Sequence, residues 1–129
     1  MRIRNFSLAL ILFVILFDWL TKILVRRQMP YKFAVVENPG LVFGLPTPGF
    51  FNLAVVLVVL LGFVLVYLWK FPHARSQTGF ALIVGGAVAN ILDRLVGGTV
   101  TDFLNFGVST VNFADLAIFS GIVALLFGL

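Results

Sequence analysis

The stretch FNLAVVLVVLLGFVLVYLW, residues 51–69, contains no charged side chain. A helix rises about 1.5 Å per residue, and about 20 apolar residues cross a hydrocarbon core of about 30 Å. This run is therefore long and apolar enough to span a bilayer. It predicts a membrane protein and gives a reference from which the other segments are interpreted.

Three further apolar stretches lie on either side of this run, at about residues 6–25, 79–96 and 112–129. The last is slightly short for a span, so we expect its first residues to lie at or just inside one membrane interface. The pattern predicts an all-α membrane protein of four transmembrane helices. We expect residues 1–129 to form one domain.

The composition supports a membrane protein and excludes several kinds of site. The chain is 61% hydrophobic and 11% charged, whereas soluble domains carry about 25% charged residues. It has no cysteine and a single histidine, His73, so we expect no disulfide, no thiol nucleophile, no metal and no cofactor. The net charge of +4 is interpreted as lipid headgroup contacts or solvated helix ends rather than nucleic-acid binding.

The connections between the spans differ in character. The first, residues 26–50, holds four of the five prolines, so a helix is not expected there. Within it, residues 32–37 are β-prone and predict a short strand or hairpin on the membrane surface. The third connection, residues 97–111, has strand-like character from 99 to 106.

The few acidic residues indicate where chemistry is possible, because ionisable groups within spans are costly and are usually paired or functional. Asp18 and Lys22 are four residues apart and share a helix face. Their spacing fits a structural ion pair, and it also fits one wall of an active site.

A second polar group ends the third span. Asn90 and Arg94 share one face, and Asp93 lies between them. Gly85 and Gly86, about one turn earlier, permit close helix packing. The group is either a polar cluster that fixes helix packing or part of a site in which Arg94 binds a phosphate or a carbonyl.

Two further carboxylates flank the start of the fourth span. Asp102 lies in the third connection, and Asp115 follows the candidate N-cap Asn112 by three residues. Acids favour helix starts in any case, but spans one, three and four place their polar residues at the same membrane face. We therefore expect one polar site at that face, formed by Asp18, Lys22, Asn90, Arg94, Asp102, Asn112 and Asp115.

Two neighbouring aspartates cannot both ionise easily and titrate as a coupled pair. One then draws a proton from water while the other hydrogen-bonds a carbonyl, as in an aspartic protease. The alternatives are a small proton or ion carrier and a structural helper subunit. A carrier should distribute its polar groups through the bilayer depth, whereas here they lie towards one face, and this favours an enzyme.

Five segments resemble the lipoprotein signal peptidase (signal peptidase II) family of bacterial membrane aspartic proteases. In order they are DWLTK at 18–22, NPGLVFG at 38–44, GGAVANILDR at 85–94, VTDF at 100–103 and VNFAD at 111–115. Each segment is short, but together they cover essentially the whole chain. Ala89 and the pair Leu41–Val42 depart from the family's usual pattern.

The resemblance implies an endopeptidase that removes signal peptides from diacylglyceryl-modified prolipoproteins, just before the lipidated cysteine. By position, Asp102 and Asp115 match the catalytic pair. The residues that match site-lining or motif positions are Asp18, Lys22, Asn38, Gly86, Asn90, Arg94, Asn112 and Ala114.

The resemblance also implies a location and partners. The family lies in the bacterial inner membrane, with both termini in the cytoplasm and the active site towards the outer face. It has a small extracytoplasmic β-structure in the first connection. The implied partners are the lipid-modified substrate and membrane lipids, with no nucleic acid, and we expect a monomer.

Overall fold

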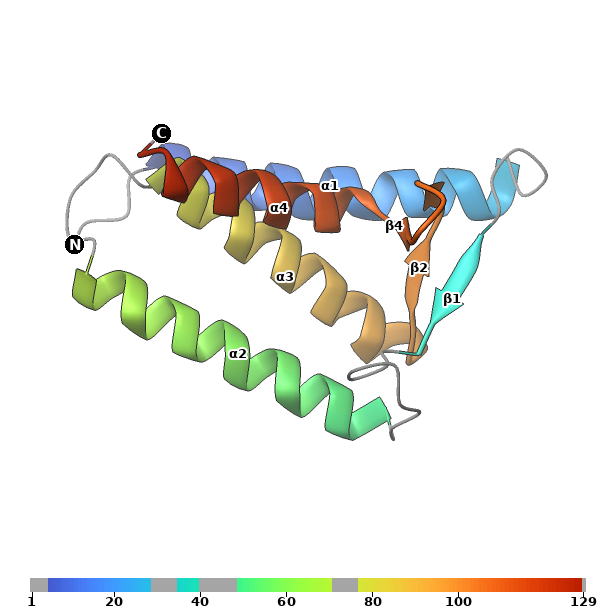
Figure 1. The fold of residues 1–129 in the computed structure, drawn as a ribbon. Coiled ribbons are helices and arrows are strands. Elements are labelled where there is room, and N and C mark those ends of the chain that lie inside the picture. Colours follow the sequence, from blue (N-terminus) through green and yellow to red (C-terminus); the bar gives the residue numbers. More distant parts are fainter. Residues whose placement is uncertain (1–4, 29–34, 40–48, 71–76, 129) are drawn as a thin grey trace.

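Four helices alternate in direction along the chain, and short strands lie across one end of them (Figure 1). The computed structural model describes residues 5–28, 35–39, 49–70 and 77–128. In chain order its elements are α1 (Asn5–Gln28), β1 (Val36–Asn38), α2 (Gly49–Lys70), α3 (Gln77–Gly97), β2 (Val100–Asp102), β3 (Leu104–Asn105), β4 (Thr110–Val111) and α4 (Phe113–Leu126). The start of α1 and the end of α4 lie at the end opposite the strands.

The prediction of a mostly helical fold is confirmed, but the fourth helix is shorter than predicted. Within the described residues, α1, α2 and α3 are long and apolar enough to cross a membrane. Helix α4 has 14 residues, or about 21 Å. It begins directly after Asn112, as predicted, but it ends at Leu126 instead of continuing to 129, because Gly128 takes a positive φ of 69° that stops helices. Residue 129 lies outside the described part.

Helix α3 is the centre of the packing, and glycines bring its neighbours close. A Cβ at Gly86 would overlap the backbone carbonyl of Ala114 in α4. Gly79 and Gly121 are similarly tight, since a Cβ on either would lie 2.7–2.8 Å from the carbonyl oxygen of the other. On the α1 side, a Cβ at Gly85 would meet the backbone of α1. The predicted role of Gly85 and Gly86 in close packing is confirmed.

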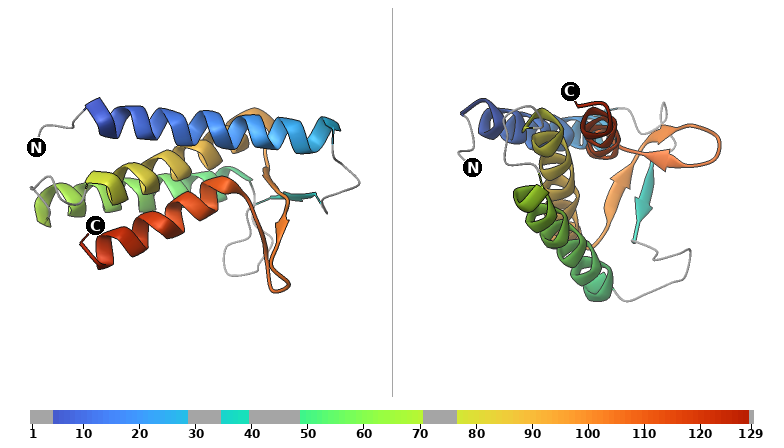
Figure 2. Two further views of the ribbon diagram at one scale, coloured as in Figure 1. Left: turned by 90° about the horizontal axis from the view of Figure 1, so that it is seen from above. Right: turned by 60° about the vertical axis from the view of Figure 1, so that its left-hand side comes forward.

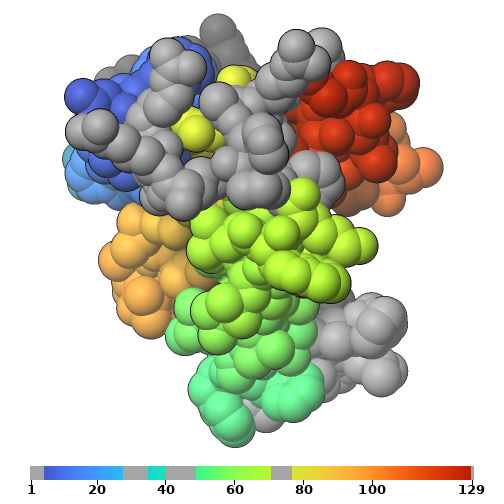
Figure 3. Space-filling view, turned by 90° about the vertical axis from the view of Figure 1, so that its left-hand side faces the viewer, coloured from blue at the N-terminus to red at the C-terminus, as the bar shows by residue number. Residues whose placement is uncertain are grey.

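Helix α2 is attached differently. Its buried residues are Asn52 and Tyr67, and the Tyr67 ring stacks on Phe80 of α3 with centroids 4.2 Å apart. Viewed from the end where α1 starts and α4 ends, α2 forms a separate green lobe beyond the other helices (Figure 3). Its apolar surface therefore faces lipid or the space beside α3 and α4.

The strands form two small antiparallel pairs at the other end of the bundle (Figure 2). Strand β1 pairs with β2, so that Glu37 lies opposite Thr101, and β3 pairs with β4 as a hairpin. The expected strand at 32–37 is found at Val36–Asn38, while residues 32–34 lie outside the described part. The strand character expected at 99–106 is confirmed by β2 and β3.

Candidate active site

The polar residues predicted to converge do lie together, where α1 and α3 end, α4 begins and β1 pairs with β2. Several are almost completely buried: Asp18, Lys22, Asn90, Asp102 and Asn112. Buried polar groups in an otherwise apolar bundle need hydrogen-bond partners. The structure provides these partners within the group itself.

Asn112 and Asp115 form a capping box at the start of α4. The Asn112 Oδ1 accepts from the backbone N–H of Asp115 at 2.9 Å, and the Asp115 Oδ2 accepts from the backbone N–H of Asn112 at 3.2 Å. This reciprocal pair satisfies two helix-end donors. It confirms the predicted N-cap and holds the Asp115 carboxylate at the first turn.

Two asparagine amides link Asp115 to Asp102. The Asn90 Nδ2 donates to Asp115 Oδ1 at 2.9 Å, and the Asn112 Nδ2 donates to Asp102 Oδ1 at 2.9 Å. The two amides also meet, because Asn112 Nδ2 lies 3.1 Å from Asn90 Oδ1. The two aspartates are thus joined through one continuous amide chain.

Asp102 is presented by β2, with help from β1. Asn38 lies two positions along the ladder from the partner of Asp102 and on the same face, and its Nδ2 donates to Asp102 Oδ2 at 3.3 Å. Burial raises the pKa of Asp102 to about 6, reinforced by the negative charge of Asp115 and opposed by hydrogen bonds from Asn38 and Asn112. A carboxyl with such a pKa holds its proton more readily than an ordinary aspartate.

Lys22 connects three polar groups at the centre of the cluster. Its Nζ lies 2.5 Å from Asp18 and 2.9 Å from Asp93, and it donates to Asn90 Oδ1 at 3.3 Å. Asp18 in turn accepts from the backbone N–H of Ala114 at 2.9 Å. The predicted Asp18–Lys22 ion pair is confirmed. Because it contacts Asn90, the pair is also part of the polar site.

Sequence reasoning assigned Asp93 no role in the site. The structure shows its carboxylate bound to Lys22 and accepting from the backbone N–H of Thr101 in β2 at 3.2 Å. Asp93 therefore ties α1 and α3 to the strand that bears Asp102. Its position three residues after Asn90 was the available signal, because residues three apart share a helix face.

Glu37 was also absent from the predicted site, and it lies on the opposite face of β1 from Asn38. It accepts from Thr99 at 2.7 Å and from Thr101 at 2.9 Å, and it lies 3.4 Å from Arg26. Burial raises the pKa of Glu37, but these hydrogen bonds and the Arg26 charge outweigh it and lower that pKa overall. Glu37 thus joins β1 to β2 and to the end of α1 without touching the dyad.

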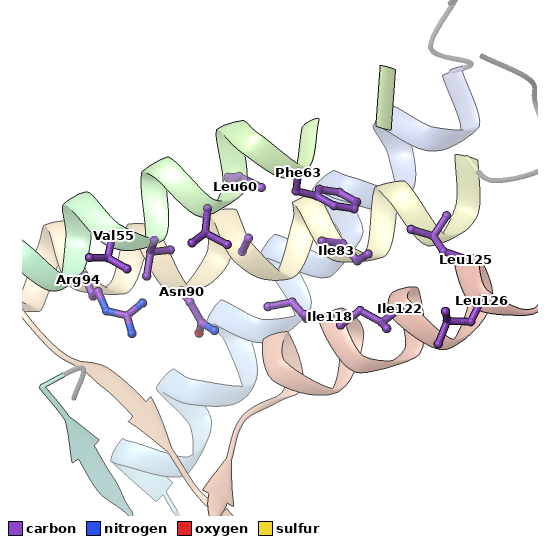
Figure 4. A pocket seen from close by; sticks show the side chains of 13 residues that line it. Val55, Leu60, Phe63, Ile83, Asn90, Arg94, Ile118, Ile122, Leu125 and Leu126 are labelled. Atoms are coloured by element: carbon purple, nitrogen blue, oxygen red, sulfur yellow. The ribbon is translucent and has the colours of Figure 1, made fainter. Parts of the chain in front are cut away.

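Arg94 and Asn90 line one end of an apolar cavity of about 570 Å³ between α2, α3 and α4 (Figure 4). The buried Nε of Arg94 has no hydrogen-bond partner among the described residues. The remaining lining is apolar and includes Val55, Val59 and Ile118. An unsatisfied donor beside an apolar channel favours a ligand that carries both a carbonyl and an apolar chain.

The described ranges hold no group of three or more His, Cys, Asp or Glu side chains arranged to bind a metal ion. Arg94, Asn38, Gly86 and Ala114 each have a structural place at or beside the site. All ten residues predicted for the site therefore fall in one region. Asp102 and Asp115 are its two carboxylates joined by amides.

Fold and site together define a membrane protein with a buried Asp102 and a half-buried Asp115 at one end of its helix bundle. Comparison with known proteins then identifies its family. The model of the family described as Signal peptidase (SPase) II matches residues 10–129, and the chain belongs to this family.

Similar proteins of known name agree with this assignment. The chain is 32% identical to the lipoprotein signal peptidase of Halothermothrix orenii, over 90% of this chain and 89% of that protein. It is 36% identical to the lipoprotein signal peptidase of Burkholderia mallei, over 93% of this chain and 84% of that protein.

Two solved structures share the fold. Both are described as a bacterial membrane enzyme determined by the in meso method, at 1.9 Å and 2.3 Å resolution. Their TM-scores are 0.80 and 0.78, at 22% and 21% identity. The matches cover 95% of this chain in each case, and 91% and 86% of those chains.

Proposed function

We propose that this chain is an aspartic endopeptidase in which Asp102 and Asp115 are the catalytic pair. The observation that carries this proposal is the amide chain through Asn90 and Asn112, which joins the two carboxylates in one site. The broader activity follows from the family: the chain removes signal peptides from prolipoproteins. The proposed cleavage is just before a diacylglyceryl-modified cysteine.

The proposed chemistry uses one shared proton. The raised pKa of Asp102 supports Asp102 as the protonated member, with Asp115 ionised. Asp115 takes a proton from a water molecule while the oxygen of that water attacks the scissile carbonyl carbon. At the same time Asp102 donates its proton to the carbonyl oxygen. As the tetrahedral intermediate collapses and its C–N bond breaks, Asp115 gives its proton to the leaving amine, and Asp102 regains a proton from a hydroxyl of the intermediate as the carbonyl re-forms.

The surrounding residues position this pair. Lys22 donates to Asn90 Oδ1, which leaves the Nδ2 of that amide directed at Asp115. Asn38 and Asn112 supply donors to the two oxygens of Asp102. These amide donors orient the Asp102 carboxylate, and they also keep its pKa lower than burial alone would make it.

The apolar cavity is the proposed binding site of the signal peptide. It runs along α3 from Leu125 and Leu126 to Asn90 and Arg94 (Figure 4), so an apolar segment lying in it reaches Asn90, which donates to Asp115. The unsatisfied Arg94 Nε is placed to donate to a backbone carbonyl of that segment. Diacylglyceryl chains are proposed to remain in the adjoining lipid.

The alternation of the helices supports placing the start of α1 and the end of α4 on one side of the bilayer, and the family resemblance supports the cytoplasm as that side. All four helices are proposed to cross the bilayer of the bacterial inner membrane, within one domain over residues 1–129. Both termini lie in the cytoplasm and the strands face outwards. The 14-residue α4 is short for a full span. It is proposed to cross the bilayer because its first residues already lie at the membrane interface, next to the strands. The active unit is proposed to be a monomer in contact with membrane lipids.

The proton or ion carrier is not favoured. Family membership indicates a protease, and the two carboxylates lie at the strand end of the bundle rather than along it. At the opposite helix ends, the Ser7 hydroxyl donates a hydrogen bond to Gln77 Oε1 at 3.0 Å. This contact carries no ionisable group.

Cleavage of a diacylglyceryl prolipoprotein by the purified protein tests the proposal. Asp102→Asn and Asp115→Asn should each reduce the rate at least about 1000-fold, because an amide can neither share nor accept the proton. Glu37→Gln is the matched control and should stay within about threefold, since Glu37 lies on the other face of β1. Normal cleavage by either dyad variant would refute the pair, and equal cleavage of an unlipidated precursor would refute the lipid requirement.

A further inference from the structure

The β3–β4 hairpin ends in an exposed apolar tip. Phe106 is 63% exposed and Val108 is 98% exposed. No Asp, Glu, Lys or Arg occurs from Phe103 to Ala114. A solvent-exposed hairpin tip normally carries polar residues, so this tip is chemically unlike a loop made for water.

The tip has a defined conformation. The backbone N–H of Phe106 donates to the carbonyl of Ser109 at 2.9 Å, which continues the β3–β4 pairing and leaves Gly107 and Val108 as a two-residue loop. Gly107 has a φ of 86°, as tight hairpin turns with glycine first require. Asn105 Oδ1 accepts from the backbone N–H of Gly107 at 2.7 Å. The two apolar side chains are therefore presented by a built turn.

The hairpin lies across the ends of the helices. In the left panel of Figure 2 it extends sideways past α4, across the helix axes rather than along them. Helix α4, which follows the hairpin in the chain, also exposes apolar side chains, Phe119 among them. A surface lying across the ends of membrane-spanning helices coincides with the interface of the bilayer.

We propose that Phe106 and Val108 insert into the membrane interface at the strand end of the bundle. The partner is the apolar part of the phospholipid layer, not its charged headgroups, because the hairpin carries no charge to attract them. The hairpin is also the covalent link between Asp102 and Asp115. Its insertion therefore sets the depth at which both carboxylates meet the substrate. This inference rests on the membrane-spanning fold and not on the proposed chemistry.

The absence of cysteine in the chain allows a single nitroxide label at Val108→Cys. The full-length protein is placed in liposomes of zwitterionic phospholipid, and the label's collisions with oxygen and with a water-soluble nickel chelate are compared. Val58→Cys, an exposed valine midway along α2, gives the bilayer reference, and free label in water gives the aqueous one. The ratio of oxygen to nickel collisions at position 108 should exceed the aqueous value at least about threefold.

Each other outcome contradicts the insertion. A nickel collision rate at 108 equal to that of the free label would place the tip in water. An increase that needs anionic phospholipid would indicate headgroup attraction. Dipolar broadening that persists after dilution into excess lipid would place a second copy of the chain over the tip. Since cleavage is not measured, failure here leaves the proposed protease chemistry intact.

Discussion

Helices α2 and α4 both pack on α3, but in opposite ways. The α3–α4 contact is built on glycines whose backbones touch: Gly79 faces Gly121, and Gly86 faces Ala114. The α2–α3 contact rests on aromatic rings, chiefly Tyr67 on Phe80, and it leaves an apolar cavity of about 570 Å³ beside it.

The difference between the α3–α4 and α2–α3 contacts matches the roles proposed for them. Hydrogen bonds of 2.9 Å between Asn90 on α3 and Asp115 on α4 tolerate little movement of the two helices. An apolar chain entering beside α2 needs space and only approximate fit. Close backbone packing therefore supports the carboxylates, and looser aromatic packing leaves the apolar cavity that ends at Asn90 and Arg94, where we propose that the signal peptide binds.

Among changes that test this comparison of the two helix contacts, the largest expected effect on cleavage comes from adding one methyl group to the tight contact. In Gly86→Ala the new Cβ overlaps the Ala114 carbonyl, which is backbone and can yield only if α4 shifts. Overpacking of this kind costs about 1–3 kcal/mol. Cleavage should fall at least about 100-fold, because Asp115 moves with α4.

Gly62→Ala on α2 is the matched control, since its Cβ would meet nothing within 4 Å. Its activity and its unfolding temperature in detergent should remain unchanged or rise slightly, because alanine favours helix more than glycine. If both glycine variants behaved alike, the contrast between the two helix contacts would be wrong.

Removing the buried cation tests the same tight region through its charges. Lys22 is 1% exposed, forms ion pairs with Asp18 and Asp93, and donates a hydrogen bond to Asn90. Lys22→Met leaves two buried carboxylates without their cation, a change that typically costs about 3–5 kcal/mol. In the folded fraction kcat should fall about 10- to 100-fold.

Arg27→Met, at an exposed position in the last turn of α1, controls for loss of a positive charge and should keep full activity. Size-exclusion chromatography and circular dichroism separate loss of fold from loss of rate. A folded Lys22→Met protein with normal kcat would show that Asn90 is positioned without the lysine.

Filling the channel tests the looser side. Val59 lines the cavity from α2, so Val59→Trp should occupy space needed by the signal peptide. Substrate binding weakens while the carboxylates stay in place, so KM should rise about 3- to 10-fold with kcat unchanged. Initial rates over a range of lipidated precursor concentrations measure both constants.

Val58→Trp places the same ring on the neighbouring residue, which is exposed and does not line the cavity. Its KM should match that of the unmodified protein. An equal rise in KM in both variants would mean that the signal peptide does not lie in this channel.

The smallest expected effect is a dependence of stability on pH. The pKa of Asp102 is about 6, above its ordinary 3.8, so between these values the folded protein binds more protons than the unfolded one. Its contribution to the free energy of unfolding is therefore full below about pH 4 and falls as pH rises to about 6. The loss is at most about 3 kcal/mol.

Unfolding temperatures in detergent at pH 4, 5, 6 and 7 check this sign. Asp102→Asn removes the titrating group. The unfolding temperature of this variant should therefore rise relative to that of the unmodified protein as pH increases, by a few degrees at pH 7. Parallel curves for the two proteins would contradict the raised pKa of Asp102.

Much of the helical fold was predictable because the bilayer imposes simple demands. A run of about 20 apolar residues without charge has few alternatives to a spanning helix. Residues 51–69 are such a run, so their composition was enough to predict a helix there. The N-cap at Asn112 and the Asp18–Lys22 pair were predictable for a related reason, since both depend on residues within one turn.

The parts that escaped prediction join distant segments. Nothing in the spacing of Glu37 and Thr101 indicates that they lie opposite each other, because pairing between β1 and β2 depends on how the intervening helices fold back. Asp93 was visible beside Asn90, but its bond to Thr101 depends on the same arrangement.

The sequence by itself thus determined the membrane environment, three helices of spanning length and the local pairs within each helix, because hydrophobicity and helical periodicity act over short distances. The ten residues predicted for the site also lie in one region, although Asp93 was missed. The tertiary structure alone decided which oxygen of each aspartate meets which amide, how Lys22 serves two carboxylates, and where α2 leaves a channel. Those features depend on atomic distances between separate helices, and such distances are set by packing rather than by sequence spacing.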